Sequence, residues 1–293
     1  MDVFVVGIKN HVASHFETEV VSETHGKSFR SGSLVLDTTS PYFPKRGDEK
    51  IMRQDTKAAI ILINELLDAF AGGLDRDEMG LYVASGVFIE NFEKHIGHLV
   101  SVFEHIKDAK DEAEKLFSIY RASPPLLALQ TLTNSTMSFI AQYTGIKGNN
   151  ATFGTSSSAG FDAILEGMNE AYYNQNPVLV AASNVAGIYS YLMNSTLYPD
   201  QENWFKNIHQ FSSDALLYSG AYTTKINTLD HTYFTNMHKN ASSIFHEIGN
   251  AGPVNLFISL EKGLEKIKAG AALVDLLDRD IYGRISHLQL EAI

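Results

Sequence analysis

The feature that most constrains the fold is an alternation of short apolar segments with longer amphipathic ones. Runs typical of buried strands lie at 3–7, 80–85, 152–155, 177–183, 214–218 and 285–290. Between them, apolar residues recur at helical spacing over 51–70, 91–120, 126–143, 158–171 and 254–268. Buried strands that alternate with helices form sheets covered by helices. The sequence therefore predicts an α/β protein, and no shift in composition marks a boundary between domains.

Glycine and proline residues set the expected limits of these segments. Ala71-Gly72-Gly73 is predicted to end the first helix, and Pro124-Pro125 to precede the third. Gly26 and Gly32 are turn signals in the mixed stretch that follows the first strand.

Charge and hydropathy exclude several classes of partner. The formal net charge is −11, and such a surface repels phosphate backbones and anionic membranes, so no nucleic-acid or membrane partner is expected. No segment approaches the roughly 20 apolar residues that span a bilayer. The first residues are apolar without a preceding basic region, which favours a first strand over a signal peptide. We therefore expect a cytoplasmic protein.

The chain contains no cysteine, which rules out a thiol nucleophile and a disulfide. Its 11 histidines are scattered. His95 and His98 stand three apart on a predicted helix, but no third metal ligand accompanies them. No glycine-rich phosphate loop follows a predicted strand. We expect no metal and no cofactor.

One segment has the form of a reactive site. Residues 151–164 predict a strand, a tight turn of small residues, Thr155-Ser156-Ser157-Ser158, and then a helix. A side chain at such a turn lies over a helix N-terminus, where free N–H groups and the helix dipole favour negative charge. The geometry suits a nucleophile and its oxyanion. The simpler interpretation is that the serines only cap the helix.

Together with its flanks, this segment resembles the nucleophile turn of β-ketoacyl synthases, in the thiolase superfamily. The matching segments follow the family's order: Val5-Val6-Gly7, Met52-Arg53-Gln54-Asp55, residues 80–86, Ser123-Pro124 with the helix to Asn134, Gly145-Ile146-Lys147-Gly148-Asn149-Asn150, and His246-Glu247-Ile248-Gly249-Asn250-Ala251-Gly252. The last fits the family motif His-x-x-Gly-x-Ala-Gly, which is fairly specific, whereas the glycine-rich approach alone is a weak signal.

This resemblance implies a thiolase-like layered fold in which helices sandwich mixed sheets. It implies one ketosynthase-like domain over 1–293, with a half at 1–175 that carries the nucleophile turn and an abbreviated half at 176–293. Only 246 − 157 = 89 positions separate Ser157 from His246. Family members carry a considerably longer stretch there, so the second half is expected to be shortened.

The sequence departs from the family at the reactive positions. The family's cysteine aligns with Ser157, and a hydroxyl needs an adjacent base to react where a thiolate does not. His246 matches the second family histidine, but Thr235 falls where the first belongs. His231 and His238 lie nearby without the family's glycine-threonine context and are expected on loops or the surface.

A glycine-rich turn that gates the site in the family is also replaced. Residues 277–283 stand in its place, and only Gly283 is kept. The nucleophile, one histidine and the gating turn have thus all changed, which points to a ketosynthase-like protein that no longer condenses.

The resemblance then implies a chain-length factor, the cysteine-less sister subunit of type II polyketide systems, of the aryl-polyene or flexirubin type. Such a subunit pairs with a cysteine-bearing ketosynthase, shapes the acyl-chain pocket, and meets an acyl carrier protein that bears the chain. Asn134, Met137 and Phe139 are candidates for the pocket and the dimer contact. The alternative for Met137 and Phe139 is ordinary core packing.

Two other functions remain open from the sequence. An acyltransferase or hydrolase would use Ser157 as nucleophile and His246 as base. Ser158 is a rival nucleophile, but Ser156 replaces the first glycine of a Gly-x-Ser-x-Gly elbow. A third hypothesis is a homodimer that holds an acyl chain or carrier protein without chemistry.

Overall fold

The computed structural model describes residues 4–11, 16–22, 27–32, 35–70, 74–86, 97, 100–104, 106, 111–122, 132–154, 158–185, 207–209, 211–219, 224–228, 252–279 and 285–292. Within these ranges, no helix has both the length and the apolar character needed to cross a bilayer.

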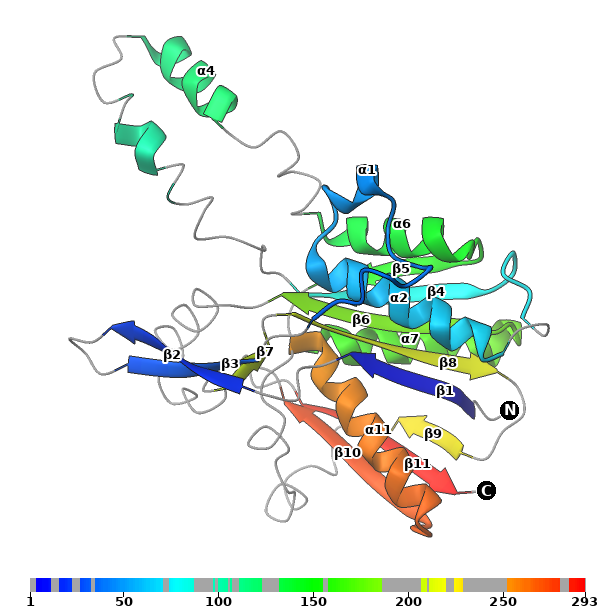
Figure 1. The fold of residues 1–293 in the computed structure, drawn as a ribbon. Helices are drawn as coiled ribbons and strands as arrows, with labels where there is room; N and C mark the ends of the chain where they lie inside the picture. The colour runs from blue at the N-terminus through cyan, green and yellow to red at the C-terminus, as the bar shows by residue number, and fades with distance from the viewer. Residues whose placement is uncertain are drawn as a thin grey trace.

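A mixed sheet of eight strands runs through the molecule in the order β10-β11-β9-β1-β8-β6-β4-β5 (Figure 1). β4 pairs in parallel with β5 and β6, whereas β8 is antiparallel to both β6 and β1. One residue pair, Phe4 with Lys225, joins β1 to β9. The strands are β1 (Phe4–His11), β4 (Gly80–Ser85), β5 (Asn150–Phe153), β6 (Val178–Val185), β8 (Phe211–Ser219), β9 (Thr224–Thr228), β10 (Leu273–Arg279) and β11 (Ile285–Ala292).

Helices cover the central strands on both faces. α2 (Gln54–Asp68) and α6 (Thr133–Thr144) pack on one face, and their apolar side chains form a core with those of β4 and β6. α7 (Ala159–Asn174) and α11 (Asn255–Lys268) lie on the other face. Because β4 and β6 are buried on both sides, their strands are apolar or small along their whole length.

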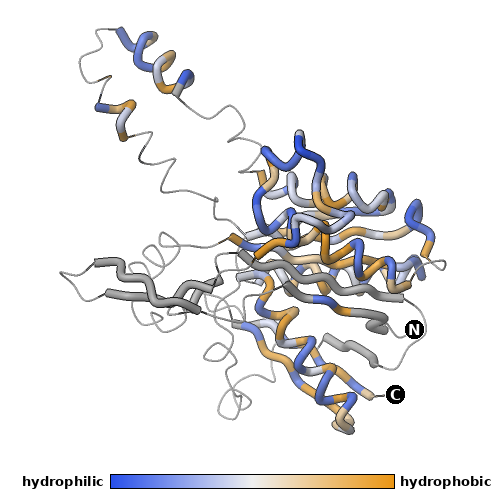
Figure 2. Tube along the Cα trace, in the orientation of Figure 1, coloured by the Kyte–Doolittle hydropathy of each residue, from blue (hydrophilic) through white to orange (hydrophobic). Residues whose placement is uncertain are grey.

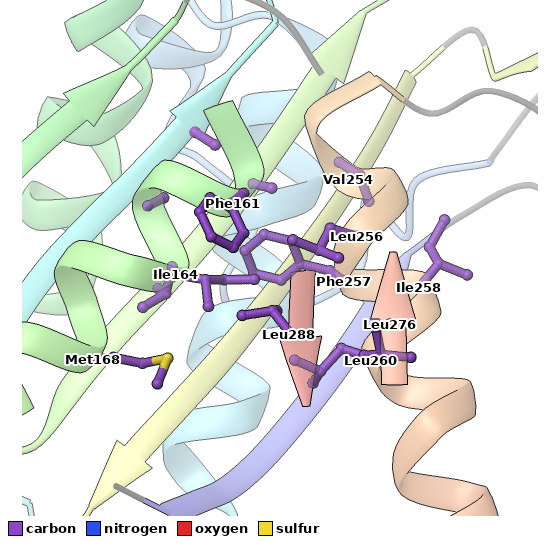
Figure 3. Close-up of a cluster of buried hydrophobic side chains, with 14 of the residues drawn as sticks. Phe161, Ile164, Met168, Val254, Leu256, Phe257, Ile258, Leu260, Leu276 and Leu288 are labelled. Carbon is purple, nitrogen blue, oxygen red and sulfur yellow. The ribbon is translucent and has the colours of Figure 1, made fainter. Parts of the chain in front are cut away.

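The second core joins the central strands to the β10–β11 pair. Phe257 of α11 is fully buried among Phe161 and Ile164 of α7 and Leu288 of β11 (Figure 3). α11 approaches the strands closely at Gly263, where a Cβ atom would lie 2.6 Å from Cδ1 of Leu290. The core is therefore continuous from the central sheet through α7 and α11 to β10 and β11.

Two further parts lie beside these layers. β2 (Phe16–Ser22) and β3 (Lys27–Gly32) form an antiparallel hairpin, and β7 (Asn207–His209) pairs in parallel with β3. α4 (Glu112–Ala122) stands apart from the sheets, as Figures 1 and 2 show. The short helices α1 (Arg46–Glu49) and η3 (Gly252–Val254) precede α2 and α11.

The predicted α/β class is confirmed, and most predicted segments have their expected type. The strand predicted at 80–85 coincides with β4, and the helix predicted at 254–268 differs from α11 by one residue. The strands predicted at 214–218 and 285–290 lie within β8 and β11, and those predicted at 3–7 and 177–183 overlap β1 and β6, which begin at Phe4 and Val178. The strand predicted at 152–155 is shifted two residues toward the N-terminus, as β5.

One helical prediction is wrong in extent. A helix over 126–143 is contradicted because Leu132 is extended, at φ −73° and ψ 122°, and α6 begins only at Thr133. The helical region predicted at 91–120 contains helical residues at 97, 100–104 and 106 and most of α4, with an interruption at Asp111. Gly32, predicted as a turn signal, lies at the end of β3. The predicted breaks at 71–73 and at Gly26, Pro124 and Pro125 lie outside the described residues.

Candidate functional site

Gly154 and Ser158, which flank the predicted reactive turn, lie where the carboxyl ends of β4, β5 and β6 meet the N-terminus of α7. Such a position, at the end of parallel strands and the start of a helix, is where α/β proteins place ligands. Residues 155–157, including Ser157, lie outside the described residues, but Gly154 and Ser158 on either side are described. The surroundings of the turn can therefore be built from its flanks.

Two glycines let the flanks of the turn approach neighbouring residues closely. A Cβ atom at Gly154 would lie 2.7 Å from Cγ2 of Thr133 and 3.7 Å from the carbonyl oxygen of Ser85. A Cβ atom at Gly160, in the first turn of α7, would lie 2.2 Å from the carbonyl oxygen of Pro253. Larger residues therefore do not fit here, and the start of α7 is held directly against η3.

Asn184 forms the third side of this region. Its side chain lies between Gly86, just after β4, and Gly252, the last glycine of the His-x-x-Gly-x-Ala-Gly motif. A Cβ atom at Gly86 would lie 2.0 Å from Oδ1 of Asn184, and one at Gly252 would lie 2.8 Å from the same oxygen. Gly252 also has a φ of +60°, which few other residues adopt. Gly252, the last residue of the motif, is thus packed against the ends of β4 and β6.

A buried polar network supports the opposite side of the turn. Arg53 donates two hydrogen bonds to the Asp55 carboxylate, from Nε to Oδ1 at 3.0 Å and from Nη2 to Oδ2 at 2.7 Å. Nη2 also reaches Oγ of Ser85 at 2.9 Å and Oγ1 of Thr136 at 3.3 Å. The hydroxyl groups of Thr56 and Thr136 form a hydrogen bond of 3.0 Å. The network fixes α2, α6 and the end of β4 together beside Gly154.

The serine-cap interpretation is not supported at Ser158. This residue is buried and precedes α7 with helical dihedral angles, φ −65° and ψ −12°. Its side chain makes no capping hydrogen bond to α7, although its carbonyl oxygen accepts one from the backbone N–H of Asp162 at 3.1 Å.

The three candidate pocket residues on α6 lie on different faces. Asn134 is exposed, and Met137, one turn later, is half-buried and accepts a hydrogen bond on Sδ from Oγ1 of Thr152 in β5, at 3.3 Å. Phe139 is half-buried against the α2 core, about 160° around the helix from Met137. The structure thus brings Met137 beside β5, while Met137 and Phe139 both pack, half-buried, against the core formed by α2, α6, β4 and β6.

The remaining predicted positions have no described environment. His246, Thr235, His231, His238, His95 and His98 lie outside the described residues, as does Gly283. Residues 277–279, part of the segment that replaces the gating turn, form the end of strand β10.

Sequence reasoning missed Asn184, Ser85 and Thr136 in this region. Asn184 and Ser85 could have been found from their positions in the sequence, because each is a polar residue near the carboxyl end of a largely apolar strand. Nothing in the sequence around Thr136 indicates that it contacts Arg53, which precedes it by 83 positions.

Comparisons with known proteins show similarity at the level of structure. No protein-family model and no curated protein matches the chain. A type II polyketide acyl-carrier protein in complex with its ketosynthase bound to the hexaketide contains a similar chain, with a TM-score of 0.64, 14% identity and 90% of each chain covered. The chain has the ketosynthase fold.

Two other solved structures with this fold are complexes of two kinds of subunit. One is a ketosynthase in complex with its chain length factor from Xenorhabdus doucetiae, with a TM-score of 0.63, 11% identity, and coverage of 100% of this chain and 98% of that chain. The ishigamide ketosynthase/chain length factor has a TM-score of 0.63 and 13% identity, and covers 90% of this chain and 87% of that one. The expected thiolase-like layered fold is therefore confirmed.

Proposed function

We propose that this protein is a chain-length factor, a ketosynthase-like subunit that pairs with a cysteine-bearing ketosynthase and shapes its acyl-chain pocket. The observation that carries the proposal is the ketosynthase fold in a chain without cysteine. A helix N-terminus stabilises a thiolate but does not ionise a serine. The frame of the site is tightly packed, while the group that condensation requires is missing.

The open edge of the sheet supports a paired subunit. β5 ends the strand order and, within the described residues, pairs only with β4. An edge strand presents unpaired N–H and C=O groups and is normally covered. α6 flanks β5 and directs Met137 to that side. A partner at this edge would contact the wall on which we propose the acyl chain rests.

Substrate and setting follow from the same role. The chain would be presented by an acyl carrier protein, and the cytoplasm is the proposed location. An aryl-polyene or flexirubin-type product is our specific proposal for the pathway class. Similar solved structures include a ketosynthase–carrier complex and two ketosynthase/chain-length-factor pairs, which supports the proposed ketosynthase and carrier-protein partners.

Co-expression with the cysteine-bearing ketosynthase of the same gene neighbourhood tests the proposal. We expect a one-to-one heterodimer by native mass spectrometry, and condensation that is lost when either subunit is omitted. A lone, stable homodimer that is active without a ketosynthase would contradict the proposal.

The same preparation tests the alternative of a serine acyltransferase. The isolated protein is incubated with an acyl thioester and its intact mass is measured. We expect no covalent adduct. An adduct that disappears in Ser157→Ala and in His246→Ala would instead establish Ser157 as a nucleophile with His246 as its base.

A further inference from the structure

α4 exposes a row of large apolar side chains. Leu116 is 66% exposed, Phe117 56% and Tyr120 78%, and their spacing places them along one side of the helix. Phe103 and Val100, on the helical segment at 100–104, are 53% and 50% exposed. We call α4 and residues 100–104 together the arm.

Little packing stabilises α4 in the isolated subunit. None of its residues from 112 to 121 is buried. Helices of its length, 11 residues, are marginal in water on their own. Its side-chain contacts include an exposed pair between Lys115 and Glu112 at 3.6 Å, and the Arg121 guanidinium 4.5 Å from the centre of the Phe117 ring. Exposed interactions of this kind stabilise a helix only weakly.

The arm arises beside the open edge of the sheet. It lies in the sequence between β4 and α6, which both contact β5. Figure 1 shows α4 on the β5 side of the molecule, far from β10 and β11. Leu132, directly before α6, is another exposed apolar side chain, at 51%.

The chemistry of the arm selects the kind of partner. Its polar positions carry both signs, with Glu112 and Glu114 beside Lys115 and Arg121. A nucleic acid or a strongly acidic protein requires a field of one sign, whereas apolar side chains at this density are typical of subunit contacts. A stable interface buries about 800 Å² on each partner, more than a four-residue edge strand supplies.

We propose that the arm is a docking surface for the ketosynthase subunit, which covers Leu116, Phe117 and Tyr120 when it pairs at the β5 edge. This proposal rests on the proposed heterodimer and names the surface that holds it together. Because the arm extends beyond the sheet, it contacts a different part of the partner from β5 and enlarges the interface.

Paired substitutions test the proposal by affinity. Phe117→Ser with Tyr120→Ser removes two exposed aromatic side chains from α4. The matched control, Tyr172→Ser with Tyr173→Ser, removes two exposed aromatics from the end of α7. We expect the arm variant to bind the ketosynthase at least about tenfold more weakly, and the control to bind like wild type. Circular dichroism and melting temperature of each isolated variant confirm that folding is unchanged.

Protection of a single thiol tests the same surface without weakening it. Because the chain has no cysteine, Tyr120→Cys provides one thiol on this subunit, and Tyr173→Cys provides the control. Mass spectrometry of the separated subunit reports its reaction with a maleimide. We expect the thiol at position 120 to react about tenfold more slowly in the heterodimer than in the isolated subunit, and the thiol at 173 to react equally in both.

The outcomes separate this inference from the proposed function. A heterodimer in which both paired variants bind like wild type, and in which position 120 stays reactive, overturns the inference and leaves the function standing. Failure of the wild-type chain to bind the ketosynthase overturns both. Protection of position 120 by a second copy of this chain, or by the carrier protein alone, assigns the arm to that partner and also overturns the inference.

Discussion

At the scale of single residues, the buried ion pair of Arg53 and Asp55 is the most sensitive point beside the site. Arg53 is 5% exposed and Asp55 fully buried, and removing one partner leaves the other charge in the interior. We predict that Asp55→Asn and Arg53→Met each lower the free energy of unfolding by about 3–5 kcal/mol, measured by urea denaturation.

The exposed pair of Lys147 and Asp77 is the matched control. Its nitrogen–oxygen distance, 2.8 Å, is similar, but both side chains are about two-thirds exposed, at 69% and 67%. Asp77→Asn should cost at most about 1 kcal/mol. Equal losses at Asp55 and Asp77 would show that burial does not decide the contribution of the Arg53 pair.

The sequence identified part of this site, and the remainder depends on contacts between distant residues. Arg53 and Asp55 were found as a motif, yet their neighbour Ser85 comes 32 positions after Arg53, and only the fold brings it there. Gly252 belongs to a sequence motif, but glycine is needed there because the side chain of Asn184 leaves no room for a Cβ atom. No local pattern indicates that contact. Local patterns predict the turn, while the contacts around its flanks, Gly154 and Ser158, depend on tertiary packing.

At the scale of elements, strands buried on both faces were predictable and polar strands were not. β4 and β6 are continuous apolar or small-residue runs, whereas β2 and β3 mix charged residues and serines with apolar ones. β2 and β3 are strands because they pair with one another, and pairing leaves no continuous apolar run that a sequence pattern could detect. β10 was missed because Asp275 and Asp278 interrupt its apolar residues, although its Leu276 faces the core.

The contact between β4 and α7 gives a prediction for alkaline pH. Tyr82 donates a hydrogen bond to Oε2 of Glu170 at 3.3 Å. Burial and the neighbouring Glu170 carboxylate raise the pKa of Tyr82 from 10.0 to about 12. The stabilisation from neutral Tyr82 is complete below the unfolded pKa, near 10, and is lost as the pH rises through the folded pKa, because only the unfolded chain ionises in that window.

Tyr82→Phe removes this titration. Between pH 10 and about 12, wild-type stability should fall more steeply than that of the variant, by at most about 1.4 kcal/mol per pH unit. Denaturant unfolding at several pH values measures the difference, and the other tyrosines cancel because both proteins contain them. Parallel stability curves would show that the Tyr82 hydroxyl ionises equally in the folded and unfolded chains.

At the scale of the whole molecule, the order of the strands bears on whether the two expected halves are separate. β6 and β8 come from 176–293, yet they lie between β1 and β4, which come from 1–175. The two halves therefore share one sheet in addition to the core of α7 and α11. We propose that residues 1–293 form a single cooperative unit, in which neither half has a complete core.

Phe257 tests this cooperativity because it links the layers. Its ring is fully buried and is shared by α7, α11 and β11, so Phe257→Ala should lower the free energy of unfolding by about 3–5 kcal/mol. If the layers form one unit, the variant unfolds in a single transition at lower temperature, with coincident curves from circular dichroism and calorimetry. Two separate transitions would show that the β10–β11 pair and α11 fold independently of the central sheet.

Leu116→Ala, on the exposed face of α4, is the control for Phe257→Ala. It should leave the free energy of unfolding of the isolated subunit within about 0.5 kcal/mol of wild type.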